Sequence, residues 1–391
     1  MKLYGRHYRL EEPVCVTIEG ERIATVELLH DIDEGTEGWP WIAPGLFDLQ
    51  VNGYGGAWFS DETLSPETVR TILERYLAHG VTRLCPTLIT NSFEAIRDGL
   101  VAIRTACERD GWVNAMVAGC HVEGPYIASD DGPRGAHPKA HVRGCDWSEF
   151  ERWQEASGNR IRLMTLAAEA ENAPDFIRRA TASGVTIAIG HTAANSEQIA
   201  AAVEAGATLS THLGNGAHPV LPRHPNYLWD QLAEPRLVPS LITDGVHIPK
   251  NFLRSVLLAK GIGNCVITCD ASGLAGSPPG IYEYNGGRFE VLADGPIVIA
   301  GQRKLLAGSG SLTDACVARA MEMADLSLAD ACDLAGTNPA RLVGCEPVEL
   351  TPGSRADLIV FQPQPHAFEV LTTVLAGETR YGAAWEPSGL E

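Results

Sequence analysis

One pattern recurs eight times along the chain. A short apolar run rich in β-branched residues ends in a polar or glycine-rich turn, and an amphipathic segment with helical spacing follows. Eight such units predict an α/β fold, a TIM-like (β/α)₈ barrel. A doubly wound open sheet, built from the same unit, is the structural alternative. The predicted strands lie at 46–53, 81–90, 116–125, 161–169, 185–192, 207–215, 238–247 and 265–273.

The segments between the runs carry helix boundary signals. SPETVRTILERYLAHG, APDFIRRATASG and SEQIAAAVEAG each open near Ser, Pro or Asn and close on glycine. This asymmetry is typical of helix ends.

The two ends of the chain have strand periodicity instead. VCVTIEGERIATVELL alternates like a half-exposed hairpin with its turn at the Gly-Glu pair, and RADLIVFQ and FEVLTTVLAGETRY also resemble strands. We expect residues 1–43 and 350–391 to form one small β-sandwich domain and residues 44–349 to form the barrel.

Charge and composition exclude some classes of protein. The chain has 30 Lys and Arg against 49 Asp and Glu, a formal net charge of −19, which argues against nucleic-acid binding. No apolar run approaches the roughly 18–20 residues that span a bilayer, and the first residues contain no apolar signal region. Ten scattered cysteines without a CxxC pair indicate reduced thiols. We therefore expect a cytoplasmic protein that binds neither nucleic acid nor membrane.

Polar residues occupy the ends of the predicted strands, where catalytic groups of a barrel lie. Each could be structural by itself: a lone histidine usually is, and a carboxylate can cap the next helix, although capping favours Ser, Thr or Asp. The set comprises Gln50, Asn52, Glu123, His191, His212, Asp244, His247 and Asp270.

Three of these residues predict a metal site. Glu123 is followed by Gly-Pro, and His191 and His212 occupy equivalent positions after neighbouring strands. Two imidazoles and one carboxylate pointing into one space would suit one divalent ion with an open water position. Zinc is the expected metal, and iron, manganese and cobalt accept the same ligands.

Asp270 ends the eighth strand and is the candidate proton acceptor. Beside a cation it would stay ionised and could take a proton from the attacking water. Its structural alternative is to cap the following loop, SGLAGSPPG.

These strand ends, in this order, resemble the N-acetylglucosamine-6-phosphate deacetylase family of the amidohydrolase superfamily over nearly the whole chain. The segments that carry the resemblance are APGLFDLQVNGYGG, CPTLITNS, CHVEGPYI, RGAHPKAHVR, AIGHTAAN, STHLGNGAHP, ITDGVHIP, TCDASGLAG, LAGSGSLTDACVARA, NPARLVG and PGSRADLIVF.

The resemblance implies a metal-dependent hydrolase that removes the acetyl group from N-acetylglucosamine-6-phosphate. Many amidohydrolases have His-x-His at the end of strand one, where this chain has Gln50-Val51-Asn52, so a single metal is implied. The catalytic aspartate of the family falls on Asp270. The histidine that contacts the substrate carbonyl falls on His137.

The resemblance also implies substrate contacts. The histidine that contacts the sugar phosphate falls on His247, and the segment that lines the sugar site falls on Asn215 and Gly216. We also count Gln50 as substrate-binding.

Two segments depart from the family pattern. Lysines usually precede the RGAH-type loop, where this chain has SDDGPRGAH with Arg134. The family's phosphate-binding arginine, which is supplied to a neighbouring subunit, has its candidate here in Arg223, with His224 assisting. That role would require a homodimer.

Other functions remain open at this point. The amide could belong to N-acetylgalactosamine-6-phosphate, an unphosphorylated N-acetyl sugar, an N-acyl amino acid or a cyclic ureide. A catalytically silent sugar-binding protein is a further alternative, which the complete set of site residues disfavours. Nucleotide binding at GSGSLTD is set aside because no GxxxxGK[ST] is present.

Overall fold

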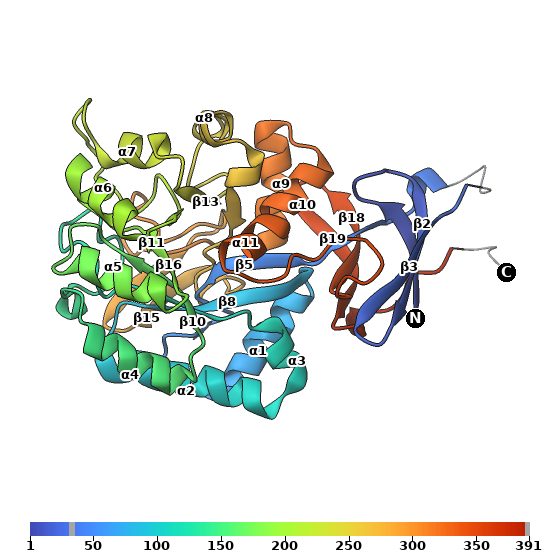
Figure 1. The fold of residues 1–391 in the computed structure, drawn as a ribbon, viewed down its shortest axis with the longest axis horizontal. Coiled ribbons are helices and arrows are strands. Elements are labelled where there is room, and N and C mark those ends of the chain that lie inside the picture. Colours follow the sequence, from blue (N-terminus) through green and yellow to red (C-terminus); the bar gives the residue numbers. More distant parts are fainter. Residues whose placement is uncertain (31–35, 388–391) are drawn as a thin grey trace.

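The structure is a computed structural model that describes residues 1–30 and 36–387. It confirms the predicted barrel: eight parallel strands follow one another in the order β14-β13-β12-β11-β10-β9-β8-β5, and helices surround them (Figure 1). The strands are β5 (Leu46–Val51), β8 (Val81–Ile89), β9 (Cys120–Glu123), β10 (Ile161–Leu166), β11 (Thr186–Ile189), β12 (Leu209–Ser210), β13 (Val238–Ile242) and β14 (Val266–Thr268).

The seam between β5 and β14 closes the barrel and rules out the open sheet. Val51 and Ala271 form a parallel bridge, and the Asn52 amide donates to the Ala271 carbonyl at 3.0 Å. Asp48, fully buried in β5, accepts from the Cys269 amide at 2.9 Å. Because buried carboxylates require such partners, these bonds fix the ends of β5 and β14 beside each other.

Two of the helices predicted from boundary signals are capped as expected. The Ser65 side chain accepts from the Thr68 amide at the start of α1, and Asn195 and Gln198 form a capping box at α6, which ends at Gly206 in a left-handed conformation. The barrel helices are α1 (Pro66–Leu77), α2 (Phe93–Arg109), α3 (Gly111–Met116), α4 (Trp147–Ser157), α5 (Ala173–Ala182), α6 (Ser196–Ala205), α7 (Tyr227–Ala233), α8 (Lys250–Lys260), α9 (Thr313–Ala324), α10 (Leu328–Leu334) and α11 (Thr337–Leu342).

The predicted β-domain from both chain ends is confirmed. Its seven strands share one mostly antiparallel sheet in the order β20-β19-β18-β4-β1-β2-β3, which lies at the right of Figure 1. The strands are β1 (Lys2–His7), β2 (Pro13–Glu19), β3 (Arg22–Leu28), β4 (Trp41–Pro44), β18 (Leu358–Gln364), β19 (Ala367–Leu375) and β20 (Glu378–Gly382). The predicted β2–β3 turn contains Gly20, whose φ is 57°.

Strand β4 ends at Pro44 in this sheet, and β5 begins at Leu46 in the barrel. The boundaries expected at 43/44 and 349/350 stay a prediction. Residues 31–35 and 388–391, assigned to the terminal domain, lie outside the described residues.

A small inserted sheet follows β14 and was not predicted. It comprises β15 (Gly280–Tyr284), β16 (Gly287–Val291) and β17 (Ile297–Ile299), all antiparallel. Tyr284 stacks on Trp58, which belongs to the short β6–β7 hairpin (Gly53–Tyr54 and Ala57–Trp58), with ring centroids 4.4 Å apart. The inserted sheet therefore packs against the turn that follows β5.

Two further findings concern membrane-spanning helices and the cysteines. Within residues 1–30 and 36–387, no helix is long and apolar enough to cross a membrane. All ten cysteines are free thiols, and only Cys345 is not fully buried.

Candidate active site

The predicted strand-end residues meet at one mouth of the barrel. Glu123 is the last residue of β9, and His191 and His212 each lie two residues beyond the ends of β11 and β12. Asp270 lies two residues beyond β14. Because the strands are parallel, their ends meet at one mouth of the barrel. Glu123 and Asp270, which are 147 positions apart in the sequence, therefore line the same cavity.

Glu123, His191 and His212 form a tight triangle of ligand atoms. Glu123 Oε1 lies 3.2 Å from Nε2 of His191 and 3.2 Å from Nε2 of His212, and the two nitrogens lie 3.1 Å apart. Ligand atoms held at about 2.0–2.2 Å around a tetrahedral ion stand roughly 3.4 Å apart. The triangle therefore has the size that a divalent ion requires.

The hydrogen bonds around the triangle are also those expected around a bound metal cation. The His191 Nδ1–H donates to the Pro133 carbonyl at 2.7 Å, which leaves a lone pair on Nε2 facing Glu123. Burial alone would raise the pKa of Glu123, but the hydrogen bonds and positive charge that the two histidines supply when protonated hold that pKa well below its usual range. At 3.2 Å, the Glu123 carboxylate and Nε2 of either histidine need a proton or a metal cation between them.

Gln50 is placed behind the triangle. Its amide nitrogen donates to Glu123 Oε1 at 2.7 Å, and its side chain is buried rather than part of the cavity lining. Gln50 thus orients the carboxylate of Glu123.

Asp270 lies in the same cavity as the triangle, 8% exposed. Burial, reinforced by the negative charge of Glu123, raises the pKa of Asp270 to about 6. Asn52 opposes this shift by donating its amide hydrogen to Asp270 Oδ1 at 2.7 Å. A cation at the triangle would oppose it further.

Three of these residues have an uncommon backbone. His191, His212 and Asp270 have φ angles of 50°, 29° and 48°, in the left-handed region. Such conformations cost on the order of 1–3 kcal/mol for residues other than glycine and are concentrated at functional sites. The strand ends therefore hold these side chains toward the cavity at the expense of local stability.

His137 approaches the triangle from the loop after β9. Its Nε2 lies 3.6 Å from Glu123 Oε2, and its Nδ1 lies 2.8 Å from the Thr90 hydroxyl. Burial, with the nearby His191, lowers the pKa of His137 to about 3, so the ring is neutral. In the tautomer in which the Thr90 hydroxyl donates to Nδ1, the ring proton is on Nε2, which faces the cavity.

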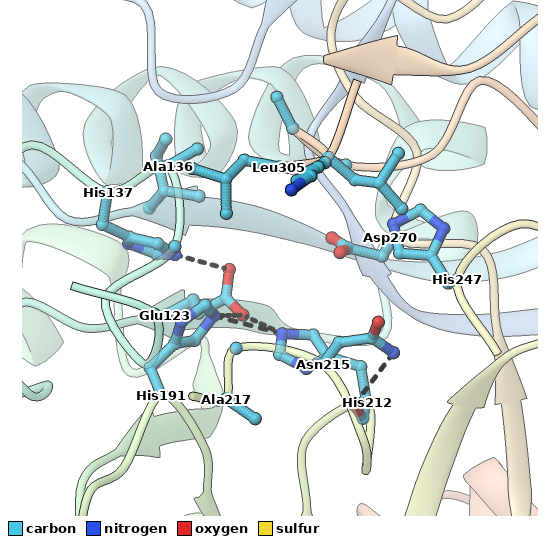
Figure 2. A pocket seen from close by; sticks show the side chains of 18 of the residues that line it. Glu123, Ala136, His137, His191, His212, Asn215, Ala217, His247, Asp270 and Leu305 are labelled. Carbon is cyan, nitrogen blue, oxygen red and sulfur yellow. Dashed lines mark hydrogen bonds and ion pairs between the residues drawn. The ribbon is translucent and has the colours of Figure 1, made fainter. Parts of the chain in front are cut away.

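These side chains line a cavity of 760 Å³. Figure 2 shows how they are arranged around it. His137, Glu123, His191 and His212 lie on one side, with Asp270 and His247 across from them. Other lining residues include Asn52, Trp58, Ile89, Asn215, Gly216, His218, Tyr284, Phe289, Gln302, Lys304 and Leu305.

The predicted sugar-binding residues divide into two groups. His247, Asn215 and Gly216 line the cavity. Gly216 has a φ of 55°, and a Cβ there would lie 2.8 Å from Nδ1 of His191, so only glycine fits. Arg223 and His224 lie outside this lining and are exposed.

Several residues that contribute to the site were not predicted from the sequence. Thr90, beside His137, carried no signal of its own. The inserted sheet that supplies Tyr284 and Phe289 could have been found, because Asn285-Gly286 between alternating apolar residues is a strong hairpin signal.

Comparison with known proteins agrees with this fold and site. A sequence model of the Amidohydrolase family matches residues 41–380, and the chain belongs to that family. It is 32% identical over 387 residues to the N-acetylglucosamine-6-phosphate deacetylase of Homo sapiens, covering 96% of this chain and 90% of the human protein. Within the amidohydrolases, the chain belongs to the N-acetylglucosamine-6-phosphate deacetylase family.

Two other relatives bear on the substrate. The chain is 30% identical over 345 residues to the N-acetylgalactosamine-6-phosphate deacetylase of a Shewanella species, covering 88% of this chain and 84% of that protein. The structure of a mutant N-acetyl-D-glucosamine-6-phosphate deacetylase from Mycobacterium smegmatis, in complex with N-acetyl-D-glucosamine-6-phosphate, is 28% identical, with a TM-score of 0.84 and 94% of each chain covered.

Proposed function

We propose that this chain hydrolyses the acetamide of N-acetylglucosamine-6-phosphate to acetate and glucosamine-6-phosphate. The observation that carries the proposal is the buried triangle of Glu123, His191 and His212 in one cavity with Asp270. The names of the relatives support the choice of an amide-hydrolysing enzyme acting on a phosphorylated amino sugar.

We propose one divalent metal ion, zinc, held by Glu123, His191 and His212. When bound, such an ion activates water and polarises the amide carbonyl. Gln50 and the Pro133 carbonyl would keep two of the ligands oriented, as partners behind metal ligands commonly do.

Asp270 carries the proton through the reaction in this proposal. It accepts a proton from the attacking water as the oxygen bonds to the acetamide carbon. It then delivers that proton to the nitrogen as the carbon–nitrogen bond breaks, so the amine leaves neutral. The hydrogen bond from Asn52 keeps the carboxylate aimed at both positions.

His137 would stabilise the negative charge that develops on the carbonyl oxygen. Its neutral ring can donate from Nε2 while Thr90 donates to Nδ1. An uncharged donor can do this without a charge that would repel the proposed cation.

The sugar phosphate would bind at His247 and along Asn215 and Gly216. Arg223 and His224 are exposed in this chain, which is consistent with our proposal that they reach the site of a second subunit in a homodimer. The cytoplasmic location stays a prediction.

The test is acetate release from a set of substrates by metal-replete protein. N-acetylglucosamine-6-phosphate should be hydrolysed much faster than N-acetylgalactosamine-6-phosphate or unphosphorylated N-acetylglucosamine. Preference for the galactose epimer would move the assignment to the activity of the Shewanella relative. No release from any of the three would contradict the proposed function.

A further inference from the structure

The carboxylate of Asp244 lies between two side chains behind the cavity. Its Oδ2 accepts from His247 Nδ1 at 2.8 Å and from the Ser309 hydroxyl at 2.8 Å. The Asp244 and His247 side chains are 4% and 6% exposed, and Ser309 is 1% exposed as a whole residue. Water therefore has little access to these bonds, and the imidazole has little freedom to rotate.

The other oxygen of Asp244 fixes the carboxylate in place. Oδ1 accepts from the backbone amides of Val246 and His247, both at 2.9 Å. Burial alone would raise the pKa of Asp244, but the hydrogen bonds, chiefly that of His247, lower it below its ordinary value. The group that His247 faces is thus a fixed negative charge.

Ser309 connects Asp244 and His247 to Asp270, which follows strand β14. Its amide donates to the Asp270 carbonyl at 2.9 Å, and its carbonyl accepts from the Ser272 amide at 2.9 Å. The segment after β17 is therefore held against the residues that follow β14, and the Ser309 hydroxyl fixes Asp244 relative to Asp270.

We infer that Asp244, held by Ser309, is a positioning residue that keeps Nδ1 of His247 protonated, so that the ring meets the substrate phosphate as an imidazolium that donates from Nε2. This inference rests on the proposed function, in which His247 meets that phosphate. A buried anion behind the ring favours its charged form, and a charged donor binds an anion about twice as strongly as a neutral one.

Replacing Asp244 with asparagine tests the position of the proton. The two backbone amides would hold the amide oxygen at the site of Oδ1, which places the NH₂ group against His247 Nδ1. That nitrogen must then accept a hydrogen bond, so Nδ1 loses its proton, Nε2 keeps its own, and the ring becomes neutral. The ring can still donate to the phosphate, but without its charge.

Kinetics give the first measurement. In metal-replete Asp244→Asn we expect KM for the phosphorylated sugar to rise about 5–10-fold, with kcat within about twofold, because a charged hydrogen bond becomes a neutral one. The rise should vanish when the substitution is made in a His247→Gln background, since Asp244 acts through His247. An unchanged KM, or an equal rise in the His247→Gln background, would overturn the inference.

Two further variants separate positioning from general damage. Ser309→Ala removes one donor and adds none, so it should raise KM about 2–3-fold and leave the proton on Nδ1. Asp314→Asn is the matched control: Asp314 is a buried carboxylate 3.1 Å from His79 Nδ1, outside the cavity. It should leave KM unchanged. A KM rise in Asp314→Asn equal to that in Asp244→Asn would overturn the inference.

Nitrogen-15 NMR of histidine-labelled, zinc-replete protein gives a readout that needs no turnover. The signals of His247, identified by their loss in His247→Gln, should show Nδ1 protonated in the parent protein and unprotonated in Asp244→Asn. The same protonation of Nδ1 in both would overturn the inference. If the parent protein does not hydrolyse the phosphorylated sugar, the proposed function fails, while these spectra still decide the role of Asp244.

Discussion

The two walls of the cavity differ in how they are built. The part of the lining that we call the strand-end wall extends from the ends of barrel strands. It comprises Glu123, His191 and His212 and, across from them, Asp270, all less than 9% exposed. The part that we call the inserted wall comes from the inserted sheet and the loop after it, and comprises Tyr284, Phe289 and the exposed Leu305. Figure 2 shows Leu305 across the cavity from Asn215.

This difference separates two tasks. Proton transfer and metal binding need side chains fixed to within a fraction of an ångström, which the closed barrel supplies. Recognition of the substrate body tolerates side chains on loops. We therefore expect substitutions in the strand-end wall to change kcat or metal content, and substitutions in the inserted wall to change mainly KM.

The strongest test of this division is Asp270→Asn. The substitution keeps the shape of the side chain but removes the group that accepts and returns the proton, so kcat should fall by about 10²–10⁴. Steady-state acetate release, with metal content measured in the same samples, checks this. Near-normal turnover would show that the strand-end wall does not carry the proton.

His212→Ala tests the metal-binding part of the same wall. Loss of a ligand should weaken metal affinity by more than the roughly 10–100-fold seen when only a partner behind a ligand is lost. Atomic absorption after dialysis should find the variant depleted in metal. If it retained the metal content of the parent protein, His212 would not be a ligand.

Asn52→Ala tests how precisely the Asp270 carboxylate in the strand-end wall must be oriented. The variant loses the 2.7 Å hydrogen bond to the Asp270 carboxylate, a charged bond worth about 1.5–3 kcal/mol, so kcat should fall at least about tenfold. Metal content should not change. A change in KM with kcat preserved would place Asn52 with the substrate-binding residues instead.

Tyr284→Ala should have the smallest effect and concerns the inserted wall. Its ring stacks on Trp58, and loss of an aromatic pair worth about 0.5–1.5 kcal/mol should raise KM about 2–10-fold while kcat stays within twofold. Tyr284→Phe keeps the stack and is the matched control, with KM near that of the parent protein. A large fall in kcat for Tyr284→Ala would remove the distinction between the walls.

The same contrast explains what the sequence could predict. Barrel topology fixes where strands end, so the eight polar strand-end positions predicted from the sequence include Glu123, His191, His212 and Asp270, which the fold brings into one cavity. Their roles in metal binding and proton transfer stay predictions. The inserted sheet is not part of the repeating strand-helix unit. The contact of Thr90 with His137 joins residues 47 positions apart, and that of Ser309 with Asp244 joins residues 65 positions apart. No local pattern reports such pairs, because they arise only when the barrel has closed.

The central claim is that one metal ion at Glu123, His191 and His212 supports amide hydrolysis. The direct measurement is a zinc titration of chelator-treated protein, with acetate release from N-acetylglucosamine-6-phosphate followed at each addition. The account predicts no activity without metal and a linear rise that saturates at one equivalent per chain. Full activity in the metal-free protein, or saturation only at two equivalents, would contradict it.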